Sequence, residues 1–246
     1  ILATSRCPRS KISHMISQHR REGPIVTLDG PAGSGKSSTA KAAATRLGFR
    51  HLDSGALYRA LTFGLLRSGL AEKEWAALGE EEFQSLNIDL ETTEHGFQVL
   101  VAGQEVDSEL RTPGVTEHVS AVASIPASRN SLLALQRRTG VDGRLVADGR
   151  DMGTVVFPDA EVKVYLIADL KERARRRLKE VGECSPDNFK IARQAKALDT
   201  RDRSDTQRSI SPLKKAEDAV ELDTTGLEFE EQVQAVVDLV ARLTLF

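Results

Sequence analysis

The sequence predicts an α/β protein in which a parallel sheet is flanked by helices. Short apolar runs rich in β-branched residues alternate with longer segments of helical periodicity, which is the order that builds parallel sheets covered on both faces. Three of these runs end in or next to an aspartate, namely Asp29, Asp53 and Asp148. Because ligands of such sheets bind at the carboxyl ends of the strands, these aspartates mark the expected position of a site.

The first elements follow from apolar runs and their end signals. Residues 25–28 form a short β-rich run, and a helical pattern follows over 36–47. Residues 49–52 predict a second strand. Asp53 or Ser54 is suited to cap the next helix, whose leucines recur at helical spacing.

The middle of the chain, residues 71–142, has a less regular pattern. Residues 97–103 alternate weakly between apolar and polar side chains, which predicts half of a small β insertion. Residues 116–138 predict a helix that is interrupted at Pro126, because proline disrupts a helix interior. This segment therefore predicts an insertion into the sheet protein.

The alternation of strands and helices returns after the insertion. Strands are predicted over 144–148 and 162–167. The second leads into a helix capped by Asp169, with Glu172 at the spacing of a capping box. A last strand over 219–223 precedes a closing helix.

Residues 1–23 differ in composition from the rest of the chain. They hold five basic residues, one acidic residue and several serines. Such a composition is compatible with an organellar transit peptide, and also with an over-long translated start, since Met15 lies just upstream of the first strand. We favour the second interpretation and expect residues 1–23 to be a disordered or non-native extension. Residues 24–246 are expected to form one domain.

Charge and cysteine content narrow the functional classes. The net charge of −2 gives no reason to expect binding to nucleic acid or to an anionic membrane. The two cysteines, Cys7 and Cys184, form no CxxC pair. This excludes a cysteine-rich zinc site and a disulfide framework, and it favours a reducing compartment, which we take to be the cytoplasm. No apolar stretch approaches the length needed to span a bilayer.

A phosphate-binding loop follows the first strand. Residues 30–37 match GxxxxGK[ST] at every fixed position and lie between a predicted strand and a predicted helix, as the motif requires. In such loops backbone amides bind phosphate oxygens, Lys36 reaches the β- and γ-phosphates, and Ser37 or Ser38 offers a hydroxyl to Mg²⁺. We therefore predict a P-loop NTPase-type sheet that binds ATP and Mg²⁺. The predicted loop residues are Gly30, Pro31, Ala32, Gly33, Ser34, Gly35, Lys36, Ser37 and Ser38.

The class of P-loop protein follows from what the rest of the chain contains. A GTPase switch needs an Asn-Lys-x-Asp element, and none of Asn87, Asn130 and Asn188 precedes a lysine. Motors and helicases are normally larger. A small kinase is the class that fits.

Four further motifs carry a family resemblance. They are DSGALYR at 53–59, SELRT at 108–112, DGRDMGTVVFP at 148–158 and RDRSDTQR at 201–208. With them, the chain from residue 24 onward resembles the bacterial cytidylate (CMP/dCMP) kinase family of P-loop nucleoside monophosphate kinases. The resemblance implies transfer of the γ-phosphoryl group of ATP to CMP or dCMP, in pyrimidine nucleotide metabolism. It also implies an acceptor-binding insertion at about 71–142 and a short lid at about 181–187.

The resemblance implies a set of acceptor-binding residues. They are Ser54, Tyr58, Arg59, Arg111, Arg150, Asp151, Arg201, Asp205 and Arg208. The phosphate of the acceptor would be held by Arg59, Arg150 and Arg208. Its cytosine edge would be recognised by Arg111 and Asp151, since an arginine donates to ring acceptors and a carboxylate accepts from the exocyclic amine.

Other roles are also implied by the resemblance. Arg201 and Asp205 would contact the sugar, and Ser54 and Tyr58 would line the pocket. Asp148 would join Ser37 or Ser38 at the metal, where it would orient bound water.

The predicted helix 169–180 carries a run of arginines. Arg173, Arg176 and Arg177 share one face at helical spacing. Such runs are usually solvated surface, but with a phosphate loop present we expect Arg173 and Arg177 to act with Lys36 in catalysis. By contrast, His51, His95 and His118 are predicted to be ordinary structural or surface histidines, because this type of phosphoryl transfer needs no histidine base.

Three other functions remain open. The acceptor could be UMP, AMP or a small hydroxy acid; the protein could be a non-catalytic nucleotide sensor; or the arginine-rich helix could bind nucleic acid. We expect small-molecule partners, ATP and CMP or dCMP, with no nucleic acid, no membrane and a monomeric state.

Overall fold

The computed structural model describes residues 21–183 and 185–244. Most of the predicted extension 1–23, and Cys184 in the predicted lid, lie outside the described residues. Within them the strands are β1 (Ile25–Asp29), β2 (Arg50–Asp53), β3 (Ile88–Thr93), β4 (Gly96–Val101), β5 (Gln104–Glu105), β6 (Leu145–Gly149), β7 (Val162–Ile167) and β8 (Val220–Asp223).

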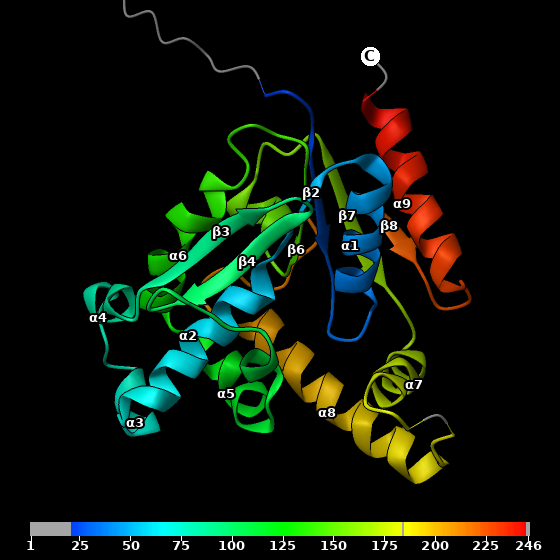
Figure 1. Cartoon of the computed structure of the whole chain (residues 1–246). Helices are drawn as coiled ribbons and strands as arrows, with labels where there is room; N and C mark the ends of the chain where they lie inside the picture. Colours follow the sequence, from blue (N-terminus) through cyan, green and yellow to red (C-terminus); the bar gives the residue numbers. More distant parts are fainter. Residues whose placement is uncertain (1–20, 184, 245–246) are drawn as a thin grey trace, which may run out of the picture.

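The helices fill the intervals between these strands (Figure 1). The α-helices are α1 (Lys36–Leu47), α2 (Ser54–Ser68), α3 (Glu72–Trp75), α4 (Glu80–Ser85), α5 (Pro113–Ser124), α6 (Pro126–Arg138), α7 (Leu170–Glu180), α8 (Asn188–Gln207) and α9 (Phe229–Thr244). A 3-10 turn covers Ser108–Arg111, and a short π-helical turn covers Met152–Val156. No helix among the described residues is long and apolar enough to cross a membrane.

The strands of the described chain form one sheet in the order β3-β4-β2-β6-β1-β7-β8, with β5 paired to β4. Strands β2, β6, β1, β7 and β8 run parallel. The prediction of a parallel sheet flanked by helices is therefore confirmed. The insertion adds an antiparallel hairpin, β3–β4, whose strand β4 pairs in parallel with β2 at the bridge between Gly96 and His51.

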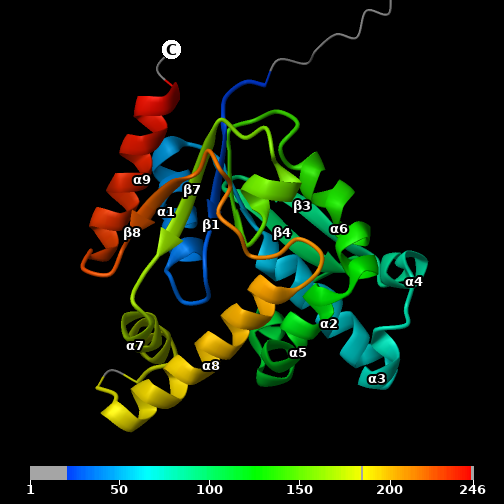
Figure 2. The ribbon, with the colours of Figure 1, turned by 180° about the vertical axis from the view of Figure 1, so that it is seen from behind.

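The two faces of the sheet are covered by different helices (Figures 1 and 2). On one face, Val26 and Leu28 of β1 pack with α1 and α9. On the other, Ile25 of β1 and Leu145 of β6 pack with α2, α5 and α6. Because successive residues of a strand point to opposite faces, and both faces are covered, every residue of β1 and β6 is buried.

Helix α8 and much of the insertion were not predicted. Helices α7 and α8 lie side by side beyond the ends of the strands, in both views of the ribbon. Their shared apolar contact is small and consists of Ala174, Ile191, Ala195 and Leu198, together with Ala32 of the phosphate loop. This contact places the start of α7, at Arg173, and Leu198 of α8 next to Gly33 of the loop.

Most of the predicted helix ends are confirmed. Gly48 ends α1 in a left-handed conformation with φ of 67°. Asp53 caps α2 by accepting from the Ala56 amide at 3.1 Å. The predicted interruption at Pro126 is confirmed: α5 ends at Ser124, and Pro126 begins α6, where the first turn does not require an amide hydrogen.

One predicted cap is only half right. Asp169 accepts from two amides at the start of α7, as predicted. The side chain of Glu172 does not complete the capping box, because it forms ion pairs with Arg175 and Arg176 instead. The amide of Asp169, which Glu172 would bind in a capping box, donates to the hydroxyl of Thr225 at 2.9 Å.

The packing of α2 gives a test of the fold. Leu65 is 1% exposed in the core and the adjacent Leu66 is 39% exposed. Leu65→Ala is expected to lower the free energy of unfolding by about 2–5 kcal/mol, because it removes buried methyl groups and leaves a cavity. Leu66→Ala should lower it by less than about 1 kcal/mol. Urea denaturation of both variants measures the difference, and equal losses would contradict the packing of α2.

Candidate active site

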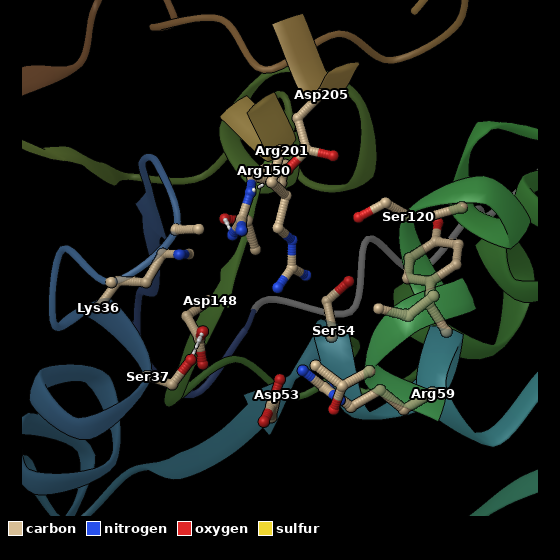
Figure 3. A pocket seen from close by; sticks show the side chains of 18 of the residues that line it. Lys36, Ser37, Asp53, Ser54, Arg59, Ser120, Asp148, Arg150, Arg201 and Asp205 are labelled. Carbon is tan, nitrogen blue, oxygen red and sulfur yellow. Dashed lines mark hydrogen bonds and ion pairs between the residues drawn. The ribbon is translucent and has the colours of Figure 1, made fainter. Parts of the chain in front are cut away.

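A pocket of about 670 Å³ brings together most of the predicted site residues, both those of the phosphate loop and those expected to bind the acceptor. It lies at the carboxyl ends of β2 and β6, between the phosphate loop and the elements α2, α5 and α8 (Figure 3). The predicted residues that line it are Ala32, Gly33, Gly35, Lys36, Ser37, Ser38, Ser54, Tyr58, Arg59, Arg111, Asp148, Arg150, Asp151, Arg177, Arg201, Asp205 and Arg208. Gly30, Pro31, Ser34 and Arg173 do not line it.

The phosphate loop has a backbone that only glycine adopts easily. A side chain at Gly30 would place its Cβ 2.2 Å from the Leu166 carbonyl oxygen, so the close approach of loop and strand requires glycine. Gly35, with φ of 90°, precedes α1, and within the described residues no side chain caps its first turn. Uncapped amides at a helix N-terminus fit an anion.

Lys36 lies buried at the start of α1 and is 6% exposed. Its Nζ donates to the Pro31 carbonyl at 3.0 Å. Burial, reinforced by the positive charge of Arg150, lowers the pKa of Lys36 to about 7. The ammonium is therefore held where its charge is poorly solvated, which favours a negatively charged ligand.

Two arginines of α7 hold the loop from outside the pocket. Arg173 donates to the Ala32 carbonyl at 2.9 Å and pairs with Asp202 of α8. Asp202 in turn accepts from the Ala32 amide at 2.8 Å. Arg176 donates to the Ser34 carbonyl at 3.3 Å. Of the arginines expected to act in catalysis, Arg177 faces the pocket, whereas Arg173 binds the backbone of the loop.

A second group of polar side chains lies beside the loop. Ser37 donates to Oδ2 of Asp148, and Nε2 of His51 lies 2.8 Å from Oδ1 of the same carboxylate. Ser38 also lines the pocket, but among the described residues the hydroxyl that bonds to Asp148 is that of Ser37. A hydroxyl next to a carboxylate at a phosphate loop fits Mg²⁺, which binds few protein oxygens and keeps water and phosphate ligands. In the described part of the chain, no cluster of three His, Cys, Asp or Glu could form a complete metal cage.

The acceptor half contains a buried ion pair that sequence reasoning missed. Arg129 of α6 pairs with Asp151, and the two side chains are 6% and 3% exposed. The guanidinium also lies over the ring of Tyr58, 4.9 Å from its centroid. Arg111, which was expected to act with Asp151, lines the pocket, but Asp151 pairs with Arg129 and, at 3.9 Å, with Arg208. No motif surrounds Arg129, so only its burial identifies it.

Cations outnumber anions around the pocket, with nine Lys and Arg side chains against five Asp and Glu. Arg150 donates to Asp205 at 2.8 Å, and Arg59 donates to Thr116 at 2.9 Å. Burial, followed by the charge of Arg150, lowers the pKa of Arg201 to about 10. So many cations in one partly dry cavity favour a polyanionic ligand.

The loop that carries Arg150 and Asp151 is held by a buried aspartate. Asp29, at the end of β1, accepts from the amides of Met152 and Gly153 at 2.9 and 2.8 Å. Burial raises the pKa of Asp29 to about 6, although these two hydrogen bonds oppose the rise. The end of β1 therefore positions both the phosphate loop and the loop after β6.

Comparisons with known proteins identify the family of the chain. The family model described as "Cytidylate kinase" matches residues 26–242. A cytidylate kinase from Chloroherpeton thalassium is 43% identical over 218 residues, which cover 87% of this chain and 92% of that protein. A bifunctional pantoate ligase/cytidylate kinase from Trichodesmium erythraeum is 42% identical over 93% of this chain, but the match covers only 42% of that protein.

The chain spans less than half the length of several bifunctional relatives that it matches. Among solved structures, a gluconokinase from Sinorhizobium meliloti 1021 is similar with a TM-score of 0.44 and 17% identity, over 92% of this chain and 95% of that one.

The buried charge of Lys36 predicts a gain in stability when it is removed. Lys36→Met should raise the free energy of unfolding of the ligand-free protein by about 1–2 kcal/mol at pH 6. Between pH 7 and 10.5 the unfolded chain binds more protons at Lys36 than the folded chain, so the parent becomes more stable as pH rises. The gain should therefore shrink at pH 9.

Urea denaturation at the two pH values measures this effect. Lys41→Met, at an exposed position of the same helix, is the control and should show no comparable gain. A Lys36→Met variant that is less stable than the parent at pH 6 would contradict the expectation that the buried charge of Lys36 destabilises the ligand-free protein.

Proposed function

Because the chain belongs to the cytidylate kinase family, we propose that it transfers the γ-phosphoryl group of ATP to CMP or dCMP, giving ADP and CDP or dCDP. The observation that carries the proposal is the pairing, in one pocket, of a phosphate loop with a buried Arg129–Asp151 pair. One end can hold a triphosphate, and the other offers a donor and an acceptor suited to a cytosine edge.

The donor end would bind ATP through the loop amides, Lys36 and Arg177. Ser37 and Asp148 would hold the metal, and Mg²⁺ bound there supplies positive charge to the β- and γ-phosphates. The loop itself would be kept in shape by Arg173 and Asp202, which already bind both backbone atoms of Ala32. These residues support positioning as the main source of rate enhancement.

The acceptor end would bind the monophosphate through Arg59, Arg150 and Arg208, and the sugar through Arg201 and Asp205. Asp151 would accept from the exocyclic amine of cytosine. Uracil has a carbonyl at that position, so it would leave the buried carboxylate facing another acceptor, which opposes binding. We include Arg129 in this end because it holds Asp151 in place.

The geometry also bears on the transfer step. The acceptor phosphate is already anionic at neutral pH, so its oxygen can attack without a strong general base. The arginines of the pocket would bring two polyanions together, and closure of the segment 181–187 would exclude water. A sensor that binds nucleotides without reacting would not need a complete acceptor end. Binding of nucleic acid through α7 is disfavoured because Arg173 and Arg176 are engaged with the loop.

The proposal also covers the domain organisation, the oligomeric state and the cellular location of the protein. We propose that residues 24–246 act as one kinase domain and as a monomer, because every group that the reaction requires lies on a single chain. The cytoplasmic location stays a prediction from cysteine content. Light scattering of the purified protein measures the oligomeric state.

The reaction is tested with a coupled ADP-release assay. With Mg²⁺ and ATP, we expect turnover with CMP and dCMP and much less with UMP and AMP. Lys36→Ala should lower kcat by about 100-fold or more, because it removes a charge that stabilises the transferring group. The exposed Lys73→Ala variant is the control and should retain activity. A preference for AMP would overturn the base assignment.

The role of Arg129 at the acceptor end is tested by a matched pair of variants. Arg129→Gln should lower kcat/KM for CMP by about 10- to 100-fold, because a hydrogen bond to a charged group contributes about 1.5–3 kcal/mol. It should also lower the CMP-to-UMP ratio. Arg111→Gln should leave that ratio close to the parent value. The reverse pattern would return the base contact to Arg111, as the sequence resemblance implied.

A further inference from the structure

His51 lies in the pocket although sequence reasoning treated it as an ordinary histidine. His51 and Asp53 are two residues apart on β2, so their side chains point to the same face of the sheet. Asp53 is opposite Asp148 in the register of β2 and β6. His51 is therefore the diagonal neighbour of Asp148, and its Nε2 lies 2.8 Å from Oδ1.

The contacts of Asp148 divide its two oxygens between different elements. Oδ2 accepts from the hydroxyl of Ser37 at the start of α1, and Oδ1 faces His51 on β2. Two contacts on opposite oxygens fix the plane of a carboxylate, whereas a contact on one oxygen leaves it free to turn. Asp148 is 1% exposed, so the loss of a partner would leave its carboxylate poorly solvated.

The carboxylate of Asp53 makes the contact between His51 and Asp148 more important. Burial and the negative charge of Asp148 raise the pKa of Asp53, while His51 opposes that rise. Without a donor at position 51, Oδ1 of Asp148 would lose its hydrogen-bond partner, while the negative charge of Asp53 would still act on Asp148. Two carboxylates of like charge repel each other, and Asp148 would turn away from Ser37.

We propose that His51 is a positioning residue for the metal site: its Nε2–H bond to Oδ1 holds Asp148 so that Oδ2 stays beside Ser37. The inference rests on the proposed function, in which Ser37 and Asp148 hold the magnesium that accompanies ATP. Partners that orient metal ligands in this way commonly change metal affinity by about 10- to 100-fold when they are lost.

The test uses two polar substitutions that differ in reach. The side-chain amide of glutamine can occupy the position of Nε2, whereas that of asparagine is too short to reach Asp148. Binding of ADP is measured by titration calorimetry, with Mg²⁺ and separately with EDTA. His51→Asn should weaken binding of Mg·ADP about 10-fold and leave binding of metal-free ADP unchanged. His51→Gln should bind Mg·ADP within about threefold of the parent.

A substitution at an exposed histidine serves as the control for this experiment. His95→Asn, at a side chain that is 73% exposed, should bind both forms of ADP like the parent. The inference is overturned if His51→Asn binds Mg·ADP as the parent does, if it loses metal-free ADP equally, or if His51→Gln loses as much as His51→Asn. A parent protein that binds neither form of ADP would instead contradict the proposed function.

Discussion

The register of three neighbouring strands is the constraint on which the site depends. Because β2, β6 and β1 run parallel and in step, Asp53, Asp148 and Asp29 reach the same edge of the sheet. Each then acts on a different loop or helix: Asp53 caps α2, Asp148 binds Ser37 of α1, and Asp29 holds the loop after β6. A slip of one residue between these strands would turn the affected aspartate to the other face.

The same arrangement concentrates charge in a place that solvates it poorly. Burial lowers the pKa of Lys36 and Arg201 and raises that of Asp29 and Asp53, so cations and anions alike are under electrostatic strain. Such strain is tolerated where a ligand relieves it, and perturbed groups of both signs are typical of functional sites. The excess positive charge of the pocket is therefore neutralised only when a polyanion is bound.

The parts of this design that sequence reasoning recovered are those with local signals. A pattern of a few consecutive residues was enough to predict the phosphate loop, the caps at Asp53 and Asp169, and the ends of the strands. Helix α8 was missed because its apolar side is short, Ile191, Ala195 and Leu198 on an otherwise polar helix. Arg129 was missed because its partner, Asp151, is 22 residues away and no periodicity links them. Contacts that depend on tertiary packing leave no pattern in a single sequence.

Helix α8 shows why those long-range contacts matter for the site. Arg201 and Asp205 are four residues apart, so they share one face of the helix, which is the face toward the acceptor end of the pocket. Asp202 is one residue on from Arg201, about 100° around the helix, and it binds the Ala32 amide of the phosphate loop. One rigid helix thus contacts both halves of the pocket. A rotation that improved its contacts with the acceptor half would withdraw Asp202 from the loop, so the two halves cannot be positioned independently.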